Sequence, residues 1–281
     1  MVTISSGLCF LPILWSFLLV VTVIVSRLMA NNTEFDDSVH SASASQWLHS
    51  IFSQLLDLLA LVGLLSIFIR YLHLEVVTRG LPQETNASIG RLRLASLIFG
   101  MGTMTGITAI SNFRQPGEKG SKGLDTFHHT GRIVIGLCGI TYCSLQAFIT
   151  FQLAKLGLST FKLFIFRIVI SILLCVIGLV HVTMEVWLAV RFLKENKPYR
   201  PWYSHRGDNE AYFLDAFSDI SEWLTFLLFA AFSSTYFMEF YDLGLEMTCF
   251  LPGYETKGAR IIEKAKYTMV NRQEIESSND D

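Results

Sequence analysis

The chain has 281 residues and a formal net charge of −2, with 51% hydrophobic and only 16% charged residues and a mean hydropathy of +0.43. Soluble domains carry about 25% charged residues, so this composition excludes an ordinary soluble domain. The nearly balanced charge gives no indication of a nucleic-acid partner. We therefore expect an integral membrane protein whose surroundings are lipids and other membrane or cytosolic proteins.

The apolar residues are gathered into six blocks, and each is about long enough to cross the hydrocarbon core of a bilayer. The blocks are residues 8–26, 51–72, 94–113, 133–151, 165–190 and 212–240. The first has no preceding positive residue and exceeds a secretory signal core in length, so we interpret it as a retained helix. The sequence predicts an all-α, polytopic membrane protein: a bundle of six transmembrane helices in residues 1–245, followed by a partly disordered cytosolic tail, 246–281.

The loops between the blocks predict how the bundle is oriented. The first loop, 29–50, has three acidic residues, no Lys or Arg, and a glycosylation sequon at Asn31. The second loop carries Arg79, Arg91 and Arg93. The positive-inside rule then makes the first loop lumenal or extracellular and both termini cytosolic. The basic residues of the fifth loop oppose this orientation, but early loops are given more weight.

The last apolar block begins with an acidic stripe. Asp215, Asp219 and Glu222 are spaced i, i+4 and i+7, so a helix places the three carboxylates on one face. We interpret Asp215 as a surface residue at the helix entry, where a carboxylate suits the positive end of the helix dipole. Glu222 lies deeper, where an unpaired charge costs about 2.5–3.5 kcal/mol or more. The sequence therefore predicts a buried partner for Glu222.

In the predicted orientation, the ionisable residues of the other blocks collect toward the outer side, because alternate helices start or end there. His128 and Arg132 share a face in the fourth block, as do His181 and Glu185 in the fifth. We expect Arg132 and Glu222 to form an ion pair. The whole predicted outer polar cluster is Asp57, Asn112, His128, His129, Arg132, His181, Glu185, Asp219 and Glu222.

The outer polar cluster can be interpreted in two ways: as ion pairs that hold the helices together, which we call structural pairing, or as a metal site. Its His, Asp and Glu side chains include ligand types that suit zinc, but their spacing matches no zinc motif, and we favour structural pairing. Phosphate-binding and GxSxG nucleophile motifs are absent from the sequence. We therefore assign no catalytic residue, metal or cofactor. Gly102 and Gly106 form a GxxxG pattern, which we interpret as a close-packing face within the bundle.

Several short motifs together resemble one known family. They are Gly7 to Pro12 with Trp15, Ser111 to Phe113, Gly139 to Tyr142 with Gln146, Ser221 to Trp223, and Phe237 with Glu239 and Phe240. The pattern resembles the damage-regulated autophagy modulator (DRAM) family and its transmembrane-150 branch. The first loop departs from close DRAM members, because it has Ser-Ala repeats and Trp47 in place of a Pro-rich segment.

The resemblance implies six spans, cytosolic termini, and residence in a lysosomal or endosomal membrane, with the plasma membrane as the alternative. It implies a non-enzymatic regulator of autophagy or lysosomal function that acts through protein or lipid partners. The alternative is a protein that handles or modifies GPI- or phosphoinositide-related lipids in a polar pocket formed by the outer polar cluster, including a metal-dependent lipid hydrolase. The resemblance brings no catalytic residues with it.

Overall fold

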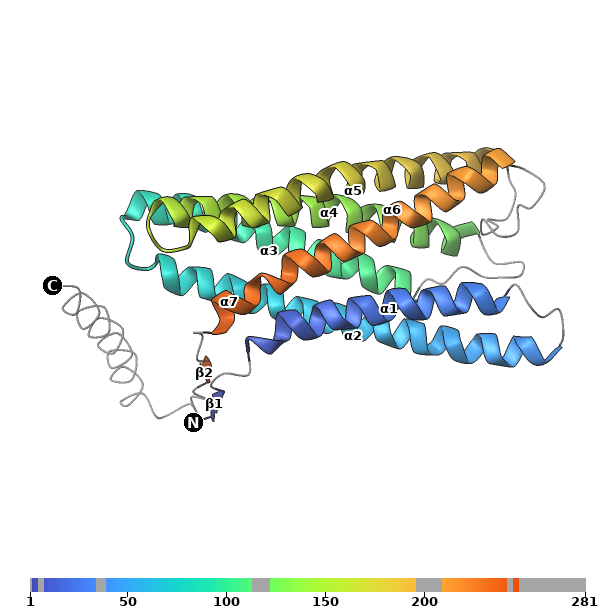
Figure 1. The fold of residues 1–281 in the computed structure, drawn as a ribbon, viewed down its shortest axis with the longest axis horizontal. Helices are drawn as coiled ribbons and strands as arrows, with labels where there is room; N and C mark the ends of the chain where they lie inside the picture. Colours follow the sequence, from blue (N-terminus) through green and yellow to red (C-terminus); the bar gives the residue numbers. More distant parts are fainter. Residues whose placement is uncertain are drawn as a thin grey trace. The chain divides into compact units, whose positions relative to one another are not determined.

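The computed structural model describes residues 2–4, 8–33, 39–112, 122–195, 209–241 and 245–247. Within them, six long helices are followed by a short seventh. Their bounds are α1 Phe10–Thr33, α2 Val39–Thr78, α3 Gln83–Asn112, α4 Lys122–Lys155, α5 Phe161–Glu195, α6 Asn209–Ser234 and α7 Tyr236–Tyr241. Figure 1 shows the long helices running side by side. The predicted helical bundle is present, and each of the first five helices extends beyond its apolar block.

Among the described residues, five helices are long and apolar enough to cross a membrane, and Phe10–Val25 is a shorter apolar stretch of α1. Large apolar side chains on the outside of the bundle fit this assignment. In α5, for example, Phe166, Ile172 and Val176 are all more than half exposed. Such a surface suits contact with lipid and would be unfavourable in water. The chain is an integral membrane protein built from helices.

The helices form a closed ring in which each long helix packs against its neighbours in sequence, and α6 returns to pack against α1. A weaker contact between α4 and α6 crosses the ring. It lies where the ring of Phe229 packs against Gly139, in the space that a Cβ on this glycine would occupy. The ring arrangement puts the core at the centre of the bundle, among side chains from several helices.

Local sequence sets the two short turns on one end of the bundle. Between α2 and α3, Gly80 and Pro82 interrupt the helical pattern, and the Asn86 amide donates to the Pro82 carbonyl at 2.9 Å. Between α4 and α5, Gly157 has a φ of 72°, which favours glycine. The Leu158 amide donates to the Leu153 carbonyl at 2.9 Å, which satisfies a carbonyl at the end of α4.

The last apolar block is not one continuous helix, contrary to the expectation from its length. It breaks at Thr235 between α6 and α7. The Thr235 amide and hydroxyl both donate to the Phe232 carbonyl, at 3.1 and 2.6 Å, and the Ser234 hydroxyl donates to Ala231 at 2.8 Å. Hydroxyl side chains that bond back to the preceding turn bend helices. Glu239 therefore lies on α7, beyond the break.

Two short strands were not expected from the apolar pattern. β1 (Val2–Ile4) and β2 (Leu245–Met247) pair in an antiparallel register that aligns Thr3 with Glu246. They belong to a small unit made from the two ends of the chain, whereas Cys9–Tyr241 form the helical unit.

The GxxxG face of α3 packs against α4. A Cβ on Gly106 would lie 2.7 Å from the Ile135 side chain and 3.0 Å from the Gly131 carbonyl oxygen, and a Cβ on Gly102 would lie 2.9 Å from Cys138 Sγ. The glycines thus allow the two backbones to approach closely, as small residues do in membrane bundles. This contact lies within the chain, as the spacing predicted.

Replacing Gly106 with alanine is therefore expected to destabilise the bundle by about 1–3 kcal/mol, because the added methyl group meets backbone that cannot yield easily. Gly90, on the same helix, has nothing within 4 Å of its added Cβ. Its replacement by alanine is the matched control and should be neutral or slightly stabilising. Thermal melting of the two purified variants in detergent distinguishes them; equal melting temperatures would show that the α3–α4 contact is looser than described.

Candidate functional site

The predicted pair of Arg132 and Glu222 is present, and it is part of a larger group. Arg132 on α4 donates to Glu222 on α6 at 2.7 Å and to Glu185 on α5 at 2.9 Å. The Ser218 hydroxyl on α6 also donates to Glu185, at 3.2 Å. The Glu185 side chain is fully buried, and the side chains of Arg132 and Glu222 are 15% and 10% exposed. One guanidinium thus joins three neighbouring helices of the ring.

His181 lies close to this ion-paired group. It is buried on α5 one helical turn from Glu185, and it borders a narrow niche together with Arg132, Glu222 and Thr225. The structure therefore brings together His181, Glu185, Arg132 and Glu222, four of the residues predicted for the outer polar cluster.

Asp57 and Asn112 belong to a different group, between α2 and α3. Asp57 accepts a short hydrogen bond from Ser111 and a longer one, 3.4 Å, from the Asn112 amide. The Ser53 hydroxyl donates to the Ser111 carbonyl at 3.0 Å. These bonds join α2 to the C-terminal end of α3. Ser111 was quoted only as part of a motif, and the structure shows it to be the central donor of this group.

Several predicted residues cannot be placed in the cluster. The side chains of His128, His129 and Asp219 lie outside the described part of the structure, although the backbone of each is helical. The same holds for Asn31, the predicted glycosylation site. Among the side chains that are described, no three of the types His, Cys, Asp and Glu are grouped closely enough to hold a metal ion.

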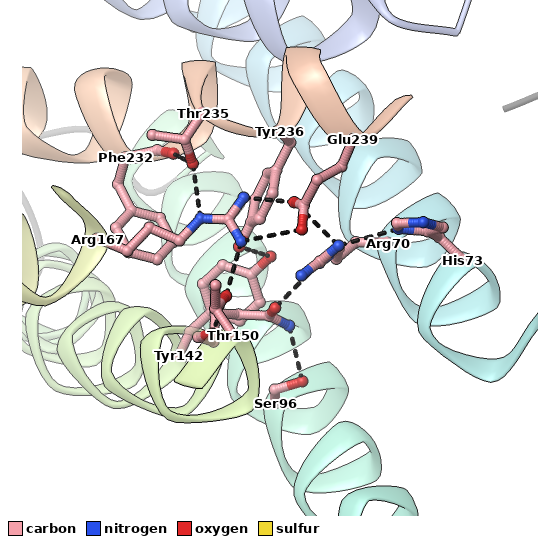
Figure 2. Close-up of polar contacts among 11 residues, drawn as sticks. Arg70, His73, Ser96, Tyr142, Thr150, Arg167, Phe232, Thr235, Tyr236 and Glu239 are labelled. Carbon is pink, nitrogen blue, oxygen red and sulfur yellow. Dashed lines mark hydrogen bonds and ion pairs between the residues drawn. The ribbon is translucent and has the colours of Figure 1, made fainter. Parts of the chain in front are cut away.

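A second buried ion-paired group, which the sequence interpretation missed, lies near the end of α2 and the beginning of α5. Figure 2 shows its polar contacts. We call it the inner cluster, and it consists of Arg70 on α2, Arg167 on α5 and Glu239 on α7. Arg70 pairs with Glu239 at 3.0 Å, and Arg167 forms two contacts with the same carboxylate, one of 3.2 Å and one that is shorter. Both arginine side chains are fully buried. Charges within the spans are therefore not confined to the outer side, and that expectation was wrong.

Hydrogen bonds extend the inner cluster to the remaining helices on that side. Arg167 donates to Thr150 on α4 at 2.7 Å and to the Thr235 hydroxyl at the α6–α7 break at 2.9 Å. Arg70 donates to Gln146 on α4 at 3.2 Å, and Gln146 in turn donates to Ser96 on α3 at 3.0 Å. The network thus connects α2 through α7.

Aromatic rings cover the two guanidinium groups. Tyr236 on α7 lies against both guanidinium groups. Its ring centroid is 4.7 Å from Arg167 Cζ and 5.1 Å from Arg70 Cζ. Its hydroxyl bonds to that of Tyr142 on α4 at 3.2 Å. Since two arginines share one carboxylate, the attraction of a cation to the face of an aromatic ring offsets part of the excess positive charge.

Signals for the inner cluster were present in the sequence. Arg167 stands alone in a strongly apolar block, where a charge is expensive and requires a partner. Arg70 lies inside α2, eight residues before its end, and Glu239 follows a run without charges from Trp223 to Met238. Both are charges within apolar blocks, so they require partners for the same reason as Glu222.

A cavity of about 150 Å³ lies inside the ring, on the side of the Arg132 pairs. Side chains from α1, α2, α3, α4 and α6 line it. Its wall is mainly aliphatic and aromatic, and Arg132 and Glu222 form the polar part. A cavity is therefore present beside the Arg132–Glu222 ion pair, and its wall is mostly apolar, whereas the sequence predicted a polar one.

A sequence model of the family described as the Frag1/DRAM/Sfk1/Cwh43P N-terminal domain matches residues 7–243, most of the chain. The chain belongs to this family. The resemblance noted from the short motifs is thereby confirmed. No curated protein and no solved structure is significantly similar to the chain.

In this member of the Frag1/DRAM/Sfk1/Cwh43P family, four of the residues that carried the resemblance take part in polar contacts between helices. Asn112 belongs to the Asp57 group, Glu222 pairs with Arg132, and Gln146 and Glu239 both bind Arg70. Buried charges in lipid must face one another or water. The motifs therefore mark the contacts that join the helices, which gives the family pattern a structural meaning in this chain.

Proposed function

We propose that this chain is a non-enzymatic integral membrane regulator of autophagy or lysosomal function that acts through protein or lipid partners. Family membership supports the class of protein. The observation that carries the non-enzymatic part is the pairing of the buried charges: Arg70, Arg132 and Arg167 all hold carboxylates from other helices. Side chains committed to such pairs stabilise one arrangement of the bundle, and their geometry fits a structural role.

The proposal includes six spans with cytosolic termini, Asn31 as a glycosylation site, and residence in a lysosomal or endosomal membrane, with the plasma membrane as the alternative. Support comes from the acidic first loop and the basic second one. Imaging of a tagged chain, with protease protection of tags at either end, tests location and orientation together.

Autophagic flux should change when the protein is removed from cells that express it, and return when the wild-type chain is restored. A Glu222→Gln chain should restore flux in proportion to its folded amount, because we assign Glu222 a structural role. Turnover of a lipidated autophagosome marker, normalised to the membrane level of each variant, measures this. Unchanged flux in the knockout would refute the autophagy proposal, and a well-folded but inactive Glu222→Gln chain would point to chemistry at that carboxylate.

A second candidate function, lipid handling, is favoured by one observation: an apolar cavity beside a buried ion pair in a membrane protein. Ligand sites in helix bundles are built between facing helices from such mixed walls. Comparing the membrane lipid composition of knockout and restored cells tests this candidate, since a lipid-handling protein should alter specific lipid classes while an autophagy regulator should not do so directly.

A further inference from the structure

The wall of the central cavity indicates what kind of molecule it can hold. Its apolar side chains come from facing helices and include Leu19, Leu56, Leu59, Ile107, Ile135 and Phe226. All of these except Phe226 are buried. The cavity is therefore a feature of the core of the ring, and not a groove on its surface.

The size of the cavity restricts the ligand further. A cavity of about 150 Å³ with Leu, Ile and Phe walls holds a guest of about the size of benzene. Sites for drug-sized ligands occupy about 300–1,000 Å³. The cavity is accordingly too small for a lipid headgroup or a sterol ring system, and it is large enough for the end of one hydrocarbon chain.

The polar part of the wall agrees with an apolar guest. Arg132 and Glu222 bond to each other at 2.7 Å, and Arg132 also binds Glu185. A charged headgroup would have to compete with these carboxylates for Arg132, whereas a hydrocarbon chain leaves the pairs intact.

A route to the cavity is given by the lining residues that are only partly buried. Val23, Phe52 and Ile110 contribute to the wall, and all three are of intermediate exposure. Ile110 lies two residues before the end of α3, and Phe52 lies on the adjacent part of α2 as judged from the Ser53–Ser111 bond. The less buried side of the cavity is thus at the outer ends of these helices.

We propose that the central cavity binds the terminal part of one acyl chain of a membrane lipid, inserted between α1, α2 and α3. This inference rests on the second candidate function, lipid handling, and names the chemical class of its ligand. The side chains that line an empty cavity have no van der Waals partners on the cavity side, and an inserted acyl chain supplies those contacts. The ion pairs of Arg132 close the cavity on the side of α4 and α6.

The test uses the full chain in lipid nanodiscs that contain a phosphatidylcholine with a photoreactive diazirine at the end of one acyl chain. Illumination and peptide mass spectrometry locate the adducts. Leu58 and Leu59 are adjacent on α2, but Leu58 is 45% exposed toward the outside and Leu59 is fully buried in the cavity wall. Adducts on cavity-lining residues such as Leu59 and Ile107, in addition to outward-facing ones, support the proposal; adducts confined to outward-facing residues overturn it.

Matched variants provide the second arm. Leu59→Phe and Ile107→Phe enlarge the wall into the cavity and should reduce cavity adducts several-fold, whereas Leu58→Phe should leave them unchanged. Wild-type melting temperature in the nanodisc shows which variants are folded, and the wild-type adduct map decides the question even if Leu59→Phe does not fold. Equal cavity labelling in folded Leu59→Phe and Leu58→Phe chains contradicts the proposal. If the cavity is labelled but the knockout leaves the cellular lipid composition unchanged, the acyl-chain site is supported and the lipid-handling function is refuted.

Discussion

Replacing Glu239 with glutamine is expected to destabilise the bundle by about 3–5 kcal/mol, the usual cost of removing one partner from a buried ion pair. The effect should be at the upper end, because Glu239 is the only carboxylate among the described residues that pairs with either Arg70 or Arg167. Without it, two fully buried guanidinium groups lie against the same Tyr236 ring with no counter-charge between them. The yield of folded protein in detergent, measured by size-exclusion chromatography, and its melting temperature report the loss.

Glu75→Gln is the matched control, because it makes the same chemical change in an exposed pair. Glu75 accepts from Arg79 at 3.3 Å, and both side chains are more than a third exposed. Pairs of this kind contribute about 0–1 kcal/mol. Arg70→Gln should be tolerated better than Glu239→Gln, since it leaves Arg167 and Glu239 as a balanced pair. Equal melting temperatures for Glu239→Gln and Glu75→Gln would contradict the role assigned to the inner cluster.

The second large effect is expected at Arg132. Replacing it with glutamine removes the ion pairs to both Glu185 and Glu222, whereas Glu222→Gln removes only one of them. We therefore expect Arg132→Gln to cost more stability than Glu222→Gln, each loss lying in the range of about 3–5 kcal/mol for a broken buried pair. Melting temperatures of the purified variants give the order, and the opposite order would show that Arg132 has equivalent partners elsewhere.

The shared arginine also determines the outcome of exchanging the two charges. A chain with Arg132→Glu and Glu222→Arg would place a new carboxylate beside Glu185, which lies 2.9 Å from the arginine in the natural chain. Simple rescue is therefore not expected. Adding Glu185→Gln to the exchanged pair should recover part of the folded yield, and the recovery measures how strongly the three helices are coupled.

The general architecture could be predicted because it depends on the length and polarity of the apolar blocks. Any segment of about 20 apolar residues must form its backbone hydrogen bonds internally in lipid, so helices were the available solution. The Arg132–Glu222 pair was predictable for a related reason, since a deep carboxylate requires a partner and Arg132 lies at the matching level. In both cases a strong physical penalty leaves few alternatives.

The remaining features depend on tertiary packing that local patterns do not specify. The break at Thr235 arises from hydroxyl groups that also appear in unbroken helices, and Arg167 binds the buried Thr235 hydroxyl at that break. Glu185 was assigned to the outer polar cluster, but its sharing of Arg132 with Glu222 depends on how α4, α5 and α6 meet. The apolar wall of the cavity combines side chains from five helices, and no single segment contains that information.

The inner cluster also has a consequence for how the chain is made. Arg70 and Arg167 enter the membrane well before their carboxylate, since Glu239 follows Arg167 by 72 positions. Ribosomes deliver these segments in order, at about 5–20 residues per second. For several seconds, therefore, each nascent chain contains Arg70 and Arg167 without the carboxylate of Glu239 that pairs with them. Glu239 then completes the network within the last turn of α7, so the two arginines gain their shared carboxylate only after almost the whole helical unit has been synthesised.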